Sequence, residues 1–300
     1  MLGFTGGHWQ SAMYARIIFF IILVLPADMA FSNPEPSQFH RAQTAVDGLM
    51  ISYVVAGEGP PIILVHGWGS DCRRNWIDSH WVQALQTRRR VICIDVRGHG
   101  KSSKPYALEP YGYAALSADV LGVMDALSVQ QADYLGYSMG AFMGAYLLGH
   151  HADRFTSMIL GGIGDETAAS AAQGAVIGQA LRADDPATIE SDYGRAVRQF
   201  VAANPDNDLI ALAYSAEAMW PEGYPLAVGG PGIKTANVPV LIVNGSQDHP
   251  YVDSADHFVN QLSDGQHVRL AGKDHLTAVT DPHFKEIALS FLRRQNVGQN

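Results

Sequence analysis

The sequence predicts an α/β fold, in which a mostly parallel central sheet carries helices on both faces. Strand-like and helix-like segments alternate from about residue 44 to the last helix, which is the pattern of repeated strand–helix units. Four apolar runs have the character of strands covered on both faces, at residues 61–65, 91–96, 158–160 and 238–243. The chain has 300 residues, 47% of them hydrophobic, and is therefore long enough to bury one large core.

The other expected elements complete this pattern along the chain. Residues 49–56 alternate as an edge strand of a hairpin does. Helix-like stretches lie at residues 75–85, 113–127, 139–150, 254–262 and 282–292, and a short strand lies at 267–270. No internal repeat is present, so the sequence predicts a single core built on one sheet.

Residues 165–236 break the alternation, because they hold no strand-like run although core strands stand on either side. They begin rich in Ala and Gly, continue with an amphipathic stretch around Val197, and end in a third stretch that starts at Leu209. We therefore expect a helical insertion after the sixth strand, with the core formed by residues 38–164 and 237–300.

Residues 1–37 are predicted to be a secretory signal peptide followed by a polar leader. Their apolar run, residues 17–25, is about half of the ~20 residues that a membrane-spanning helix needs. We expect cleavage after Ser32, with cleavage after Ala30 as the alternative, and a start at Met13 instead of Met1 stays open. Cleavage would make the protein periplasmic or secreted, whereas an uncleaved segment would be its membrane anchor.

Composition and spacing exclude two kinds of partner. Twenty Lys and Arg residues against 29 Asp and Glu residues give a net charge of −9, so no basic face is available for a nucleic acid. No spacing typical of metal ligands is present, and we expect neither a metal nor another cofactor. Cys72 and Cys93 leave two interpretations open, a disulfide in an oxidising compartment or separate thiols, with Cys93 buried in a strand.

The pentapeptide Gly136-Tyr137-Ser138-Met139-Gly140 carries the strongest chemical signal in the chain. It follows a strand-like run and precedes a helix-like one, so Ser138 is expected on a sharp turn that projects its hydroxyl above the sheet edge. The flanking glycines permit a backbone that a Cβ atom would crowd. We predict that Ser138 is a nucleophile and that the backbone N–H of Met139 binds an oxyanion.

Further residues extend this motif into a constellation. Asp248 and His275 follow Ser138 in the chain, and His66-Gly67-Trp68-Gly69 ends an upstream strand. In this order the residues resemble the α/β-hydrolase superfamily, from about residue 44 to the last helix. The resemblance implies an α/β-hydrolase fold and a Ser-His-Asp triad.

A serine nucleophile requires a histidine base and an acid that orients it. The resemblance places the base at His275, between the last short strand and the final helix. Asp248 follows an apolar strand at its carboxyl end, where active sites of parallel sheets gather, and we predict it to be the acid. Asp165 or Glu166 is the rival acid, and Asp274 is expected to face solvent.

The resemblance also assigns roles around the nucleophile. The backbone N–H of Trp68 becomes the second oxyanion donor, and the insertion becomes a lid over the site. The side chains of Trp68, Met219, Trp220 and Tyr224 are candidates for an apolar substrate pocket, although core packing explains the lid residues equally well.

A serine at the nucleophile position excludes the dehalogenase and epoxide-hydrolase branches, which place an aspartate there. We expect a carboxylesterase that cleaves a small-molecule ester through an acyl-enzyme. The alternatives are an enol-lactonase or a carbon–carbon bond hydrolase. An aminopeptidase and a non-catalytic ligand-binding fold rank lower, the latter because such proteins usually lack a member of the triad.

Overall fold

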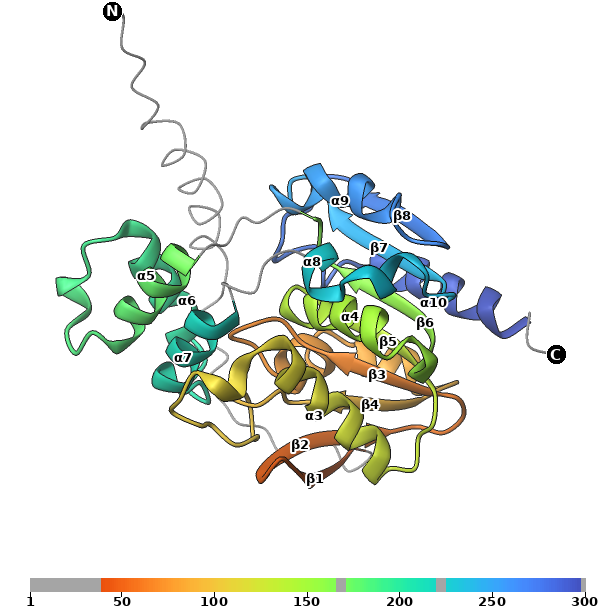
Figure 1. Ribbon diagram of the computed structural model, residues 1–300, viewed down its shortest axis with the longest axis horizontal. Helices are drawn as coiled ribbons and strands as arrows, with labels where there is room; N and C mark the ends of the chain where they lie inside the picture. The colour runs from red at the N-terminus through yellow and green to blue at the C-terminus, as the bar shows by residue number, and fades with distance from the viewer. Residues whose placement is uncertain (1–38, 166–170, 220–224, 298–300) are drawn as a thin grey trace, which may run out of the picture.

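The computed structural model describes residues 39–165, 171–219 and 225–297, and within them an eight-stranded sheet is the central feature (Figure 1). The strand order is β1-β2-β4-β3-β5-β6-β7-β8. β2 pairs antiparallel with both β1 and β4, and all other neighbours pair in parallel. The predicted α/β-hydrolase fold with a mostly parallel sheet is confirmed.

The elements have the following bounds in the described part of the chain. The strands are β1 (His40–Val46), β2 (Leu49–Ala56), β3 (Pro61–Val65), β4 (Arg90–Ile94), β5 (Ala132–Tyr137), β6 (Phe155–Gly161), β7 (Val240–Gly245) and β8 (Gly265–Leu270). The α-helices are α2 (Trp81–Leu85), α3 (Tyr113–Ala126), α4 (Met139–His150), α5 (Ala171–Arg182), α6 (Asp192–Ala202), α7 (Leu209–Met219), α8 (Pro225–Gly229), α9 (Tyr251–Val259) and α10 (Pro282–Val297). Shorter helical turns are η1 (Arg73–Ile77), η2 (Glu109–Tyr111), η3 (Ala152–Arg154), η4 (Pro186–Thr188) and η6 (Pro231–Lys234).

Two hydrophobic clusters fill the space on the two faces of the sheet. Successive residues of β3 alternate between them, with Ile63 and Val65 in the cluster shared with α3 and α4, and Ile62 and Leu64 in the cluster shared with α2 and α10. Side chains of a strand point to opposite faces in turn, so a strand covered on both faces must be apolar throughout. This burial is the reason for the continuous apolar run at Pro61–Val65.

The insertion between β6 and β7 forms a layer of its own. In Figure 1, α5, α6 and α7 stand together beside the sheet, on the left of the view. A separate cluster of apolar side chains joins these three helices, including Ile177, Val201 and Leu212. At the start of α6 the Ser191 hydroxyl accepts a hydrogen bond from Gly194 N–H and so satisfies one of the free donors there. The boundaries at residues 165 and 236 and the role of a lid stay predictions.

Two local expectations are wrong. Residues 49–56 form a strand, but it is not at the edge, because β1 pairs on its outer side and β4 on its inner side. β1 escapes a pattern search because its side chains alternate poorly and are mostly exposed. The single helix expected at 75–85 is broken into η1 and α2, with His80 between them in the left-handed region at φ 65°.

No helix in the described ranges is both long and apolar enough to span a bilayer. The predicted signal peptide and leader, residues 1–37, lie outside the described residues.

Candidate active site

Ser138 stands on a tight turn between β5 and α4. Its backbone has φ 52° and ψ −116°, a conformation that L-residues rarely adopt. The turn is so tight that a Cβ atom on Gly136 would lie 2.3 Å from the carbonyl oxygen of Gly140. A backbone hydrogen bond of 2.8 Å from Ser138 N–H to Gly161 O anchors the turn to β6. The two motif glycines are therefore required by close backbone approach.

His275 joins the Ser138 hydroxyl to the Asp248 carboxylate. Its Nε2 lies 2.9 Å from Ser138 Oγ, and its Nδ1 lies 2.9 Å from Asp248 Oδ1. An ionised carboxylate only accepts, so Nδ1 carries the proton and Nε2 is free to accept the hydroxyl hydrogen. Burial lowers the pKa of His275, but the charge and hydrogen bond of Asp248 outweigh this and raise it above 6.5.

The neighbours of the imidazole fix its position. The Tyr137 hydroxyl donates a 2.6 Å hydrogen bond to the backbone carbonyl of His275. The rings of Tyr137 and Tyr251 lie 5.4 and 5.1 Å from the imidazole, measured between centroids. Burial raises the pKa of both phenols, so they stay neutral and add no charge beside the imidazole. Neither tyrosine was singled out from the sequence, since only their contacts mark them.

The other carboxylates predicted as candidates lie elsewhere. Asp165 accepts hydrogen bonds from Leu226 N–H and stands 3.1 Å from the Nδ1 of His257. Asp274 accepts from the backbone N–H and hydroxyl of Thr277, three residues further along. Glu166 lies outside the described residues. Asp248 is therefore the carboxylate that the structure brings to the His275 ring, and its side chain is fully buried.

The segment from His66 to Cys72, here called the oxyanion loop, passes directly beside Ser138. A Cβ atom on Gly67 would lie 3.4 Å from the Cβ of Ser138. The Gly67 carbonyl oxygen accepts hydrogen bonds from His66 Nδ1–H at 2.8 Å and from Ser70 N–H at 3.1 Å. In a trans peptide the C=O and the next N–H point in opposite directions, so these bonds also set the direction of Trp68 N–H.

The other predicted donor, Met139 N–H, belongs to the first residue of α4. The first N–H groups of a helix have no intrahelical acceptor and carry the positive end of the helix dipole. This N–H therefore suits a developing negative oxygen next to Ser138.

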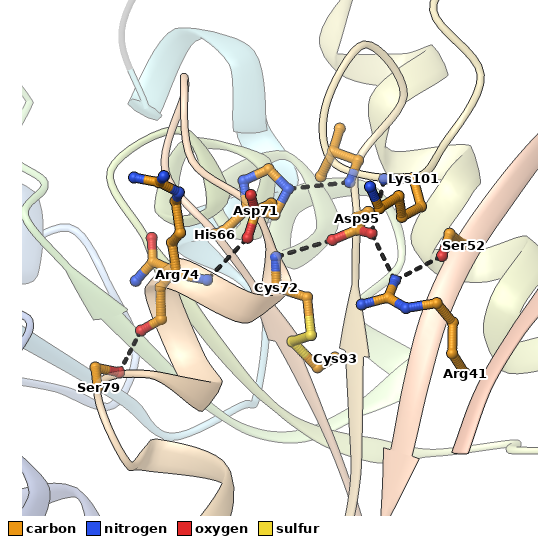
Figure 2. Close-up of a disulfide and its surroundings, with 12 residues drawn as sticks. Arg41, Ser52, His66, Asp71, Cys72, Arg74, Ser79, Cys93, Asp95 and Lys101 are labelled. Atoms are coloured by element: carbon orange, nitrogen blue, oxygen red, sulfur yellow. Dashed lines mark hydrogen bonds and ion pairs between the residues drawn. A yellow bond between two sulfur atoms is a disulfide. The ribbon is translucent and has the colours of Figure 1, made fainter. Parts of the chain in front are cut away.

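A buried histidine and a disulfide anchor the two ends of the oxyanion loop. His66 accepts a 3.1 Å hydrogen bond from Val96 N–H at Nε2, and burial lowers its pKa, so the ring stays neutral. Cys72 forms a disulfide with Cys93 of β4, with a Cα separation of 5.6 Å. Figure 2 shows this bond beside the Asp95 carboxylate, which accepts a 2.8 Å hydrogen bond from Cys72 N–H. Sequence alone left this disulfide open.

The predicted pocket residues have separate outcomes. Trp68 packs against both the central core and the insertion cluster, so its indole stands where the two meet. Met219 is buried in the central core and accepts a 3.4 Å hydrogen bond from the Ser215 hydroxyl at its sulfur, which favours core packing. Trp220 and Tyr224 lie outside the described residues. Phe142, stacked on Tyr113 at 6.3 Å and edge-on to Tyr251 at 6.1 Å, extends the aromatic surroundings of the His275 ring.

No group of three or more His, Cys, Asp or Glu side chains that could hold a metal ion occurs in the described residues.

The family model for the alpha/beta hydrolase fold matches residues 60–214. The chain belongs to the α/β-hydrolase family. It is 30% identical to 3-oxoadipate enol-lactonase 2 from Acinetobacter baylyi over 235 residues, which cover 73% of this chain and 82% of that protein. A hydrolase from Pseudomonas aeruginosa superposes with a TM-score of 0.69 at 27% identity, covering 85% of this chain and 98% of the other. The protein is thus a hydrolase of the α/β family.

Another relative in this α/β-hydrolase comparison matches over a shorter region. The dihydrolipoyllysine-residue acetyltransferase component of the acetoin cleaving system from Pseudomonas putida is 38% identical over 109 residues, or 36% of this chain. The match spans only 28% of that relative.

Proposed function

We propose that this α/β hydrolase cleaves a small carboxylic ester through an acyl-enzyme formed on Ser138. One observation carries the proposal: an unbroken chain of 2.9 Å contacts from Ser138 Oγ through both nitrogens of His275 to Asp248. A hydroxyl is a poor nucleophile until a neighbouring base takes its proton, and this chain supplies the base in the correct tautomer.

The reaction follows from this geometry in two halves. Ser138 Oγ attacks the ester carbonyl while His275 Nε2 takes the hydroxyl proton, and the buried Asp248 carboxylate stabilises the imidazolium that forms. The carbonyl oxygen becomes an oxyanion between the N–H groups of Trp68 and Met139. His275 returns the proton to the leaving alcohol, which leaves the acyl group on Ser138. Water then attacks the acyl-enzyme by the same route and releases the acid.

The distribution of cations supports an uncharged substrate. Residues 165–233 contain three basic residues, Arg182, Arg195 and Arg198, and residues 136–149 contain none. Arg182 pairs with Glu217 and stacks 4.5 Å over the Tyr214 ring, Arg195 pairs with Asp192, and Arg198 donates to the carbonyls of Ala180 and Leu181. A substrate carboxylate held by the insertion would leave water beside arginines that already have other partners, which is unfavourable. We therefore place a neutral ester first.

An enol-lactonase is the second candidate, favoured by the 30% identity to 3-oxoadipate enol-lactonase 2 over most of both chains. A lactone of 3-oxoadipate retains a carboxylate, so the two candidates differ in the charge of the substrate. A carbon–carbon bond hydrolase would use the same triad on an uncharged or a charged ketone and is the third.

Matched esters test the proposal. p-Nitrophenyl butyrate and mono-p-nitrophenyl glutarate share a leaving group and differ mainly in an acyl carboxylate. We expect turnover of the butyrate, loss of that turnover by a factor of at least ~10⁴ in Ser138→Ala, and much slower cleavage of the glutarate. Faster cleavage of the glutarate, or of an enol-lactone bearing a carboxylate, would contradict the neutral-ester assignment. Butyrate turnover unchanged in Ser138→Ala would contradict the nucleophile.

We also propose that the protein is exported by residues 1–37. The Cys72–Cys93 disulfide supports this, because such bonds persist mainly in oxidising compartments. N-terminal sequencing of the protein expressed with its leader tests the proposal: a mature terminus at Asn33 agrees with export, and an intact Met1 or Met13 in the cytosol contradicts it.

A further inference from the structure

The turn between α6 and α7, residues 203–208, here called the docking turn, lies against the oxyanion loop. Asn207 Nδ2–H donates a 2.9 Å hydrogen bond to the carbonyl oxygen of Gly69, and Asn204 Nδ2–H donates a 3.1 Å bond to Asp71 Oδ2. Asn204 and Asp71 are both buried. The insertion thus contacts the loop that carries Trp68, although the bonded residues are more than 130 positions apart in the chain.

Two further contacts of the docking turn lie at its exposed rim. Lys101 Nζ pairs with Asp206 at 3.0 Å, and the Tyr106 hydroxyl donates a 2.6 Å hydrogen bond to Asp208. Both bonds are exposed and neither touches the oxyanion loop. Exposed polar pairs contribute little to stability. These rim contacts therefore provide matched controls for the bonds that Asn204 and Asn207 make to the oxyanion loop.

The bond from Asn207 acts on the part of the oxyanion loop next to Trp68, where the direction of the backbone N–H matters. The Gly67 carbonyl is held from within the loop by His66 and Ser70, and Asn207 holds the Gly69 carbonyl from outside. Gly69 has φ 74°, and a Cβ atom there would lie 2.8 Å from Val201 Cγ1 of α6. The loop and the insertion are therefore closely packed at Gly69. Trp68 N–H lies between the two held carbonyls.

We propose that Asn207 and Asn204 are positioning residues that align Trp68 N–H for the oxyanion, so that the insertion completes the active site instead of only covering it. The inference rests on the proposed function, because it assigns the Trp68 N–H the role given there. An oxyanion hole works by holding its donors in place before the charge develops, so a loop that wanders lowers kcat more than it raises KM.

The first test exchanges the donor of Asn207 for an acceptor. In Asn207→Asp a carboxylate replaces the amide that donates to Gly69 O and to Val201 O. We expect kcat for p-nitrophenyl butyrate to fall on the order of 10- to 100-fold, below the full loss of an oxyanion donor, with KM changed only a few-fold. Binding of an alkylboronic acid, which becomes tetrahedral on Ser138, should weaken by a similar factor. Tyr106→Phe, which removes a rim bond, should keep kcat and boronate affinity.

The second test restores the contact with its polarity reversed. Asn204→Asp sets two buried carboxylates against each other and should lower kcat; adding Asp71→Asn supplies an amide donor again and should recover most of the loss. This pair keeps the proposal testable if Asn207→Asp does not fold. A merely structural role would lower the melting temperature without changing kcat per folded molecule or boronate affinity.

The outcomes separate the two proposals. If wild-type protein does not cleave the ester, the proposed function fails. If wild type is active and folded Asn207→Asp or Asn204→Asp matches Tyr106→Phe in kcat and boronate affinity, the positioning role is overturned while the proposed function stands.

Discussion

The tight turn that carries Ser138, here called the elbow, and the oxyanion loop lie side by side, but the contacts that hold them differ in range. The elbow is shaped by a close contact between neighbours in sequence, since Gly136 packs against the carbonyl of Gly140 four residues later, and the bond from Ser138 N–H to Gly161 O ties it to β6. The oxyanion loop is held by Cys93, Val96 and Asn207, which are 21, 30 and 138 positions away from their partners. In the proposed mechanism the elbow presents the reacting hydroxyl of Ser138, whereas the loop presents only a backbone N–H in a set direction. Damage to the triad should therefore stop the chemistry, and damage to the loop should weaken it in a graded way.

The largest effect that tests this comparison is expected at Asp248, the proposed acid of the triad. Asp248→Asn places an amide donor against His275 Nδ1 and so favours the wrong tautomer, which should lower kcat by roughly 10⁴-fold. Asp165→Asn, the matched control, should stay within a few-fold of wild type because Asp165 contacts Leu226 and His257 instead. Steady-state kinetics of both variants check this. A reversal of the two results would move the acid to the end of β6.

The next effect is the dependence on pH. In the proposed mechanism His275 acts as a base only when neutral, and Asp248 raises its pKa above 6.5. The kcat/KM should therefore be full above that raised pKa and fall about tenfold per pH unit as the pH drops below it. A pH profile of ester hydrolysis measures this inflection. A flat profile from pH 8 to pH 5, or an inflection clearly below 6.5, would contradict the contact between His275 and an ionised Asp248.

The smallest effect is expected at the far end of the oxyanion loop. Replacing both Cys72 and Cys93 by Ala removes a crosslink across 21 residues, and the free energy of unfolding should fall by about 3 kcal/mol through the entropy of the unfolded chain. Both sulfurs are buried, and His66, Ser70 and Asn207 still hold the loop, so kcat should fall only a few-fold. Urea unfolding and kinetics of the same variant check the two values. A loss of kcat as large as that of Asp248→Asn would remove the contrast between the elbow and the oxyanion loop.

The same difference in range explains what could be predicted from the sequence. The fold class followed from buried strands such as Pro61–Val65, whose apolar run reflects their covering on both faces. The approach of Ser138, Asp248 and His275 was predictable because each follows a strand, and the carboxyl ends of parallel strands meet at one edge of a sheet. Local motifs and strand order were therefore sufficient to predict the part of the site that holds Ser138, Asp248 and His275.

The rest depends on tertiary contacts that leave no local pattern. β1 is mostly exposed, and only its pairing with β2 defines it. The break at His80 is a single left-handed residue within a helix-like stretch. Asn204 and Asn207 are ordinary turn residues in sequence, and their contacts with Asp71 and Gly69 become visible only when the insertion is placed on the core. The cluster of Asn and Asp in a turn within the insertion is the one signal that could have marked this contact.

The most direct test of the central claim is covalent labelling of the nucleophile. A fluorophosphonate reacts with a serine only where a base activates it and an oxyanion hole holds the tetrahedral product. Mass spectrometry of the labelled wild-type protein should find one modified residue, Ser138, with labelling abolished in Ser138→Ala and strongly slowed in Asp248→Asn. Labelling that persists in folded Ser138→Ala, or that falls on a different serine in wild type, would contradict the account.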